Sequence, residues 1–207
     1  MPLDTCRRPF ELNQTTPPVG PLNTVSQVFF NADSTKLMTT VKGDPTKNNT
    51  CFLSVFPVEN KLVSTKETRS SRDGTAVLFG AALLPNSNEI FVTDASFGAA
   101  TLSLSNTNIA STLKSTKVLD QKATCWAAFS ELTGTSFVTD VAANHLVEID
   151  PTSGDIVKDF ELTNGNAGLI DLVSAGRFIY ALSPGNTTVG SAAAVTVFDV
   201  SGGRGSC

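Results

Sequence analysis

The sequence predicts an all-β fold, a β-propeller, and a repeated unit is the main reason. The tripeptide Val-Thr-Asp occurs at residues 92–94 and again at 138–140, an offset of 46 residues. Weaker copies flank these two, centred on Met38, 54 residues before Val92, and on Tyr180, 42 residues after Val138. Repeats of roughly 40–50 residues that contain only short strands are typical of propeller blades. We therefore expect four recognisable four-stranded blades.

The second and third units show the plan of a blade best. An apolar run opens the second unit, and alternating segments follow it, separated by turns such as Pro85-Asn86-Ser87-Asn88. The third unit repeats this order, with turns such as Pro151-Thr152-Ser153-Gly154. The strands expected in these two units cover residues 75–84, 89–95, 99–105, 111–119, 125–131, 135–141, 145–150 and 156–162. The predicted blades cover residues 25–74, 75–120, 121–165 and 166–200.

The fourth unit lacks an outermost strand, because the glycine-rich residues 201–207 follow residue 200 and predict a flexible tail. Residues 1–24 precede the first unit as an extended segment, and they contain one strand-like stretch at 8–12. That stretch could complete the last blade and remove an exposed sheet edge, which would bring Cys6 near Cys207. The blades then form either a closed four-bladed ring or part of a propeller of roughly seven blades.

Composition excludes several classes of partner. The net charge is −4 and no extended basic cluster is present, so nucleic-acid binding is not expected. No apolar run approaches the ~20 residues that a membrane span requires. The first six residues have no apolar core, so they are not a signal peptide.

The cysteines and the glycosylation sequons indicate a secreted, extracellular or cell-surface glycoprotein. None of the four cysteines has the close spacing of a zinc site, and no phosphate-binding loop is present, so neither a metal nor a cofactor is expected. Four cysteines allow three disulfide connectivities, and the sequence does not choose between them. The disulfide candidates are Cys6, Cys51, Cys125 and Cys207, and the glycosylation acceptors are Asn13, Asn48 and Asn186.

Several longer segments of the sequence are similar to those of a known protein family. These are LNQTTPP at 12–18, PLNTVSQ at 21–27, VKGDP at 41–45, VTDASFGAA at 92–100 and ATCWA at 123–127. On these strings the chain resembles fungal secreted β-propeller proteins of the 3-carboxymuconate cyclase-like or lactonase-like type. The resemblance covers most of this chain and corresponds to the C-terminal half of such proteins, which have about seven blades and a secretory leader.

The resemblance implies a reaction on a small carboxylate, as in a cyclase (an isomerase) or a lactonase. Such chemistry needs an acid/base pair and cationic groups that hold the carboxylates. The weak catalytic candidates are His145, Arg69, Arg72, Asp94 and Asp140; Lys36 and Arg177 are further cations, and Glu89 and Glu131 further bases. None of them falls in a spaced motif that matches a catalytic set of that family.

Three of the catalytic candidates, and the single tryptophan Trp126, also have a structural interpretation. His145, the single histidine, follows a turn and opens an alternating strand, where a strand-edge role is the alternative to a catalytic base. Asp94 and Asp140 end equivalent strands, so they either cap the adjacent turns or form part of an acidic ring that could bind calcium. Trp126, beside Cys125, is either a core residue or a sugar-stacking platform.

The sequence leaves two functions in view. The first is a secreted or surface propeller that binds a protein partner or a small ligand without catalysis in this chain. The alternative is a lactonase or muconate cyclase-type enzyme. We favour binding, because no acid, base and cation converge in the sequence. Self-association is expected if the propeller is incomplete.

Overall fold

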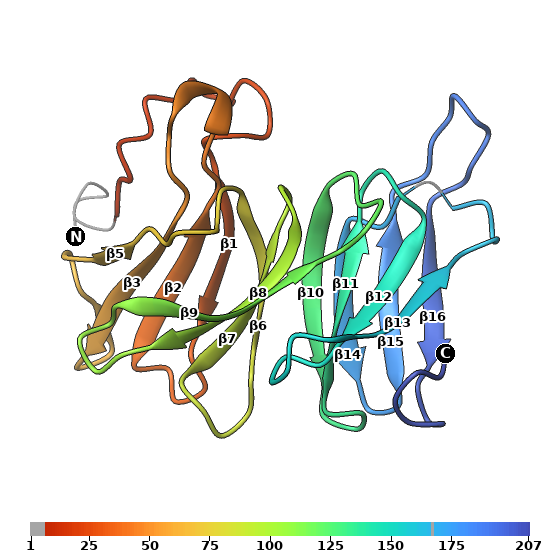
Figure 1. Cartoon of the computed structure of the whole chain (residues 1–207). Coiled ribbons are helices and arrows are strands. Elements are labelled where there is room, and N and C mark those ends of the chain that lie inside the picture. Colours follow the sequence, from red (N-terminus) through yellow and green to blue (C-terminus); the bar gives the residue numbers. More distant parts are fainter. Residues whose placement is uncertain (1–6, 167) are drawn as a thin grey trace.

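The computed structural model describes residues 7–166 and 168–207, and these residues fold into antiparallel β-sheets without an α-helix. Four sheets follow one another along the chain as the blades of a β-propeller (Figure 1). Blade 1 consists of β1 (Val25–Phe30), β2 (Lys36–Val41), β3 (Phe52–Glu59), β4 (Leu62–Val63) and β5 (Thr68–Ser70). Blade 2 consists of β6 (Leu78–Leu83), β7 (Glu89–Asp94), β8 (Gly98–Leu104) and β9 (Ala110–Lys117).

Blade 3 repeats the four-stranded plan, and blade 4 has three strands among the described residues. Blade 3 consists of β10 (Thr124–Ser130), β11 (Thr135–Asp140), β12 (His145–Ile149) and β13 (Ile156–Glu161). Blade 4 consists of β14 (Asp171–Ala175), β15 (Phe178–Ser183) and β16 (Ala194–Asp199). The all-β propeller prediction is therefore confirmed, and the predicted strands of blades 2 and 3 lie within three residues of the observed ones.

A β-bulge in the first strand distinguishes blades 1 to 3 from blade 4. In blades 1 to 3 the pairing of the first two strands shifts by one residue, and a threonine of the second strand accepts a hydrogen bond from the backbone N–H at the shift. The three donor–acceptor pairs are Gln27 with Thr40, Gly80 with Thr93, and Trp126 with Thr139. Blade 4 has Leu182 at this position and its first two strands pair without a shift.

These registers correct the alignment of the outer two repeats by one residue. Ala81 pairs with Val92 and Ala127 pairs with Val138. The residues equivalent to Val92 and Val138 are Thr39 in blade 1, which pairs with Val28, and Ala181 in blade 4, which pairs with Leu172. Met38 and Tyr180, which the sequence repeat matched to the valines, therefore lie one position earlier and point to the opposite face of their sheets.

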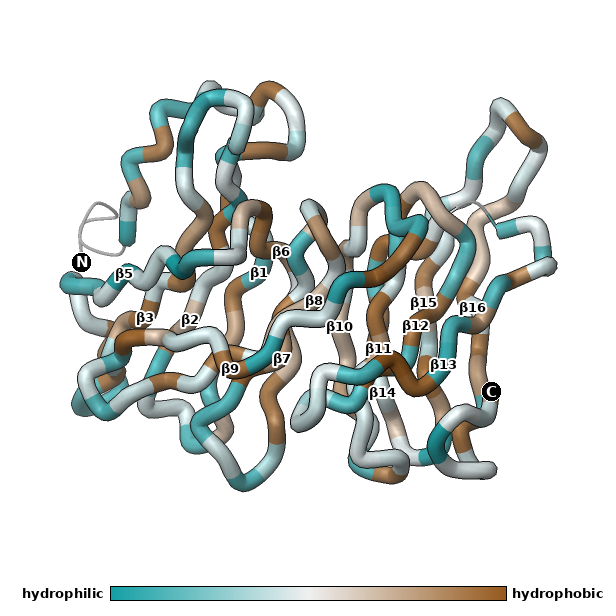
Figure 2. The backbone as a smooth tube through the Cα atoms, in the orientation of Figure 1, coloured by the Kyte–Doolittle hydropathy of each residue, from teal (hydrophilic) through white to brown (hydrophobic). Residues whose placement is uncertain are grey.

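Three apolar clusters hold the blades together, one at each junction between neighbours. Met38 and Val55 of blade 1 pack with Val92 of blade 2, and Phe91 of blade 2 packs with Val138 of blade 3. At the last junction the core residues are Ala128, Phe137, Leu146, Leu169, Leu172, Ile179, Ala181, Phe198 and Val200. The outer strands β9 and β13 are mostly exposed and carry alternating hydrophilic residues (Figure 2). The core therefore lies between blades, as face-to-face sheet packing requires.

The four blades form an arc whose first and last members lie at opposite ends of the molecule (Figure 1). The described part of the N-terminal segment does not complete blade 4. Instead Phe10 packs against Phe52 and Phe56 of blade 1, and Arg8 donates hydrogen bonds to the carbonyl groups of Val63 and Ser64. An aromatic ring and a long cation thus hold this segment on the first blade. Cys6 lies outside the described residues.

The C-terminal residues, expected to be a flexible tail, are hydrogen-bonded to blade 3. The Arg204 guanidinium pairs with Asp150 at 2.7 Å and donates to the carbonyl group of Thr133. The backbone N–H of Gly205 donates to the fully buried Glu148 carboxylate at 2.8 Å. The tail therefore supplies a partner for a buried carboxylate, which would otherwise be costly to bury.

Candidate functional site: the axial groove

The two repeated aspartates are buried and bonded to backbone amides at the ends of β7 and β11. Asp94 accepts hydrogen bonds from the backbone N–H groups of Ala76, Val77 and Ser96 and from the Ser96 hydroxyl. Asp140 accepts from four backbone N–H groups, those of Lys122, Ala123, Ala142 and Ala143. Each carboxylate therefore joins the segment that enters its own blade to the turn that follows its strand. This geometry is the capping alternative.

The acidic ring that could bind calcium has no counterpart in the other two blades. The equivalent positions carry Val41 in blade 1 and Ser183 in blade 4. The described residues contain no group of three His, Cys, Asp or Glu side chains arranged to hold a metal ion. Asp94 and Asp140 are instead committed to backbone donors.

The remaining catalytic candidates lie in different blades with separate partners. His145 is a largely buried residue of β12, and its Nδ1 lies 3.2 Å from Asp159 Oδ1 on the neighbouring strand β13. Arg69 is on β5 of blade 1, where it pairs with Glu67 at 2.5 Å and lies over the Phe52 ring. Arg72 follows β5 in the same blade. Among the described residues no ion pair joins His145, Arg69 or Arg72 to Asp94 or Asp140, although Arg72 lies in the segment before β6 whose Ala76 N–H donates to Asp94.

A long hollow, which we call the axial groove, runs along the first strands of all four blades. Its volume is about 800 Å3. Each blade lines the groove with its first strand: β1 through Gln27, β6 through Ala82, β10 through Trp126 and β14 through Leu172. The other lining residues are Ala32, Leu83, Leu84, Pro85, Asn86, Ala127, Ala128, Phe129, Glu131, Asp171, Val173 and Ser174. A concave, mostly apolar site with a few polar groups is the usual form of a ligand site.

The charge of the axial groove is acidic. Glu131 and Asp171 are exposed carboxylates, and the described residues that line the groove include no lysine, arginine or histidine. Trp126 and Phe129 add aromatic rings to the same surface. Arg177 lines an adjoining hollow, where its guanidinium already pairs with Asp199 at 3.0 Å. The groove thus combines apolar and aromatic surface with negative charge.

Trp126 packs partly in the core and partly lines the axial groove. It is half-buried, its ring packs edge-on against Phe79 with centroids 6.1 Å apart, and it also borders the core between blades 3 and 4. Its remaining surface lines the axial groove. Sequence reasoning identified the residue but could not place it at the axis, because the groove is assembled from strands about 50 residues apart.

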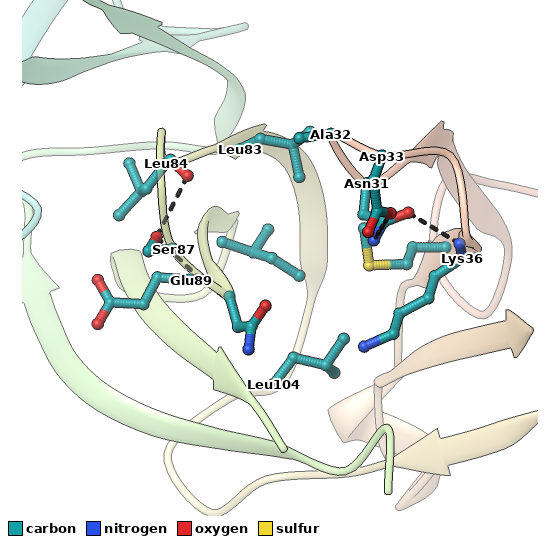
Figure 3. Close-up of a pocket in the computed structure, with 12 residues that line it drawn as sticks. Asn31, Ala32, Asp33, Lys36, Leu83, Leu84, Ser87, Glu89 and Leu104 are labelled. Carbon is teal, nitrogen blue, oxygen red and sulfur yellow. Dashed lines mark hydrogen bonds between the residues drawn. The ribbon is translucent and has the colours of Figure 1, made fainter. Parts of the chain in front are cut away.

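A smaller hollow of about 120 Å3 lies between blades 1 and 2 (Figure 3). Its lining includes two residues considered as a cation and a base, Lys36 and Glu89. The Lys36 amine extends toward Leu104 while the Glu89 carboxylate lies on the far side (Figure 3). Asp33, on the same turn, accepts hydrogen bonds from Thr35 and Asn31. The hollow therefore does not assemble an acid/base pair.

Sequence reasoning missed a buried lysine at the other end of the first strands. Lys42 is largely buried, and its ammonium lies 4.3 Å from the centre of the Phe79 ring, a cation–π contact. Burial lowers the pKa of Lys42, and the nearby Cys125 partly opposes this effect. Burial also raises the pKa of Cys125 to about 12, so this thiol is a packing group at neutral pH.

The cysteines in the described residues form no disulfide. Cys51 and Cys125 are buried free thiols in blades 1 and 3, and Cys207 is also free. The glycosylation acceptors Asn13, Asn48 and Asn186 are all exposed. They lie before β1, in the connection from β2 to β3 and in the connection from β15 to β16; the latter two loops extend from the same end of the propeller (Figure 1). The turns that line the axial groove, such as Pro85-Asn86, lie at the opposite end.

Comparison with known proteins supports the fold. No protein-family model matches the sequence, and no curated protein matches it either. Three solved structures are similar in fold: a hydrazine synthase of Kuenenia stuttgartiensis, a nidogen/laminin complex and a structure titled as a gluconolactonase. Their TM-scores are 0.65, 0.57 and 0.59, at sequence identities of 16%, 14% and 14%.

The extent of these similarities is informative. They cover 90%, 82% and 89% of this chain, but only 49%, 60% and 60% of the respective structures. The chain thus spans about half to three fifths of the length of its structural neighbours. Among the described residues, no helix is long and apolar enough to cross a membrane.

Proposed function

We propose that this propeller binds its ligand or partner in the axial groove, without catalysis in this chain. The ligand class is a small molecule, or a short segment of a protein, with an apolar or aromatic body and a positive charge. One observation carries the proposal: the first strands of all four blades build one groove that combines Trp126 and Phe129 with Glu131. Aromatic rings beside a carboxylate attract organic cations through cation–π and Coulomb terms.

The same observation weighs against a carboxylate substrate. A lactonase or muconate cyclase must hold an anion and stabilise negative charge in the transition state, which needs cations or convergent N–H donors. The similarity in fold to the gluconolactonase favours this alternative, but fold similarity does not carry a reaction from one protein to another. The acidic lining supports binding of a cation instead.

Calorimetric titration with two probes of similar size and opposite charge tests the proposal. We expect benzyltrimethylammonium to bind with a Kd on the order of 1 mM, and phenylacetate to bind at least tenfold more weakly. Glu131→Gln removes one groove carboxylate and is expected to weaken binding of the cation about fivefold, or about 1 kcal/mol. Stronger binding of phenylacetate, or hydrolysis of an added lactone at a saturable rate, would contradict the proposal.

The matched control is Glu59→Gln. Glu59 is an exposed residue at the end of β3 in blade 1 and does not line the groove, so this change removes the same charge elsewhere. Its affinity for benzyltrimethylammonium should equal that of the unmodified protein. Equal losses in the two variants would indicate a general effect of net charge.

We also propose that the protein works outside the cell or at its surface as a glycoprotein. Support comes from the exposed acceptors Asn48 and Asn186, on loops that extend from the end opposite the groove turns, where glycans leave the groove open. When the chain is routed through a eukaryotic secretory pathway, we expect glycosidase-sensitive mass on both asparagines. Thr50→Ala and Thr188→Ala should each remove one glycan. Secreted protein without any glycan would contradict this proposal.

A further inference from the structure

The two end blades of the arc each present an uncovered apolar face. On blade 4, Val173, Val195 and Val197 are 57%, 58% and 52% exposed, and they lie with Tyr180 and Leu182 on one face of the sheet. On blade 1, the first strand exposes Val25, Val28 and Phe30 on the face opposite blade 2. Large contiguous apolar faces that are exposed to solvent mark interaction surfaces.

The face on blade 4 is of the kind that packs against a following blade. Phe91 and Phe137 lie on this face of blades 2 and 3, where the next blade buries them almost completely. Tyr180 takes the corresponding position in blade 4 but remains partly exposed. The face therefore has the character of a blade junction whose second member is absent from the described residues.

The face on blade 1 is of the complementary kind. Val28 occupies the place of Ala81, Ala127 and Leu172, which face the preceding blade and are only 6%, 5% and 4% exposed. Val28 itself is 64% exposed. The N-terminal segment covers the outer part of this face through Phe10 on Phe52 and Phe56, and beside it a hollow of about 280 Å3 remains over Val25 and Val28.

A polar contact at the junction of blades 1 and 2 shows how the open faces could match. The Gln27 side chain accepts a hydrogen bond from the Ala81 N–H at 2.6 Å and donates one to the Ala81 carbonyl. In blade 4, the residue equivalent to Gln27 is Asp171. In blade 1, the residue equivalent to Ala81 is Val28. An Asp171 carboxylate facing a Val28 N–H would repeat half of this bridge.

We propose that a second copy of this chain occupies both open faces. Blade 4 of each copy packs on blade 1 of the other, and a two-fold axis along the axial groove closes an eight-bladed ring. Closed two-fold symmetry is the commonest form of oligomer, and eight blades lie within the range of known propellers. The inference does not rest on the proposed ligand.

Mass in solution tests the closure. We expect light scattering of the full chain at about 50 µM to give twice the chain mass of 21.7 kDa. Val28→Lys and Val197→Lys place a charge on each face at exposed positions, so each single variant should keep its circular dichroism spectrum and become monomeric. Asp171→Asn should raise the dimer dissociation constant about threefold to tenfold.

The matched control is Val189→Lys, at a 68% exposed position in the loop between β15 and β16, outside both faces. This variant should remain dimeric. A monomeric unmodified chain, an open-ended series of larger oligomers, or a dimer that survives both Val28→Lys and Val197→Lys would overturn the proposal. Groove binding is measured by heat and ring closure by mass, so the two proposals can fail separately.

Discussion

Replacing Asp140 by alanine is expected to lower the free energy of unfolding by about 4 kcal/mol. The carboxylate is fully buried and accepts hydrogen bonds from four backbone N–H groups, which alanine would leave without their acceptor. In a chain of 207 residues this loss corresponds to a melting temperature about 10 °C lower. Asp94→Ala should behave alike, because Asp94 holds the equivalent turn of blade 2.

Thermal unfolding followed by circular dichroism measures both effects. Asp73→Ala is the control, since Asp73 is an exposed loop residue, and its change should stay within about 0.5 kcal/mol. Asp140→Asn keeps one acceptor oxygen and should fall between the alanine variant and the unmodified protein. If Asp140→Ala unfolds within 1 kcal/mol of the unmodified protein, the capping role assigned to the repeated aspartates is wrong.

Gly80→Ala is expected to destabilise the chain by about 3 kcal/mol, because a methyl group there has no room. A Cβ atom on Gly80 would lie 2.8 Å from both the Cys125 carbonyl oxygen and the Trp126 Cα on the next blade. The first strands of blades 2 and 3 would therefore have to separate. Chemical denaturation measures the loss, and faster reaction of the buried Cys125 thiol with a disulfide reagent reports the separation.

Ser111→Thr provides the comparison for the added methyl group. Ser111 is exposed on β9, the outer strand of blade 2, where one more carbon meets solvent. Its stability should be unchanged within about 0.5 kcal/mol. An equally stable Gly80→Ala protein with an unreactive Cys125 would contradict the close approach of the two strands.

The strands of blades 2 and 3 could be predicted because their signals are local. The alternation of residues 145–150 and turns such as Pro85-Asn86 specify a strand and its end within a few residues. The one-residue offset at Met38 and Tyr180 was missed because neither segment repeats the Val-Thr-Asp string, so only the strand pairing aligns Thr39 and Ala181 with Val92.

Local sequence patterns could not predict the features that depend on contacts between distant parts of the chain. The position of the N-terminal segment depends on Arg8, which reaches carbonyl groups 55 and 56 residues away. The tail depends on Arg204, which reaches Thr133 across 71 residues. The axial groove likewise needs the first strands of four blades to converge, so no local pattern in the sequence identifies its lining as one site. Sequence reasoning correctly weighed capping for Asp94 and Asp140, because their chemistry is local.

The single tryptophan of the chain gives an optical signal from the axial groove, the proposed binding site. Because Trp126 lines the groove, a bound molecule must alter its fluorescence. Titration with benzyltrimethylammonium should give a saturable change in Trp126 emission with the same midpoint as the calorimetric binding curve, while phenylacetate should give little change over the same range. Binding heat without any change in Trp126 emission, or a stronger response to phenylacetate, would show that the axial groove is not the site that binds the cation.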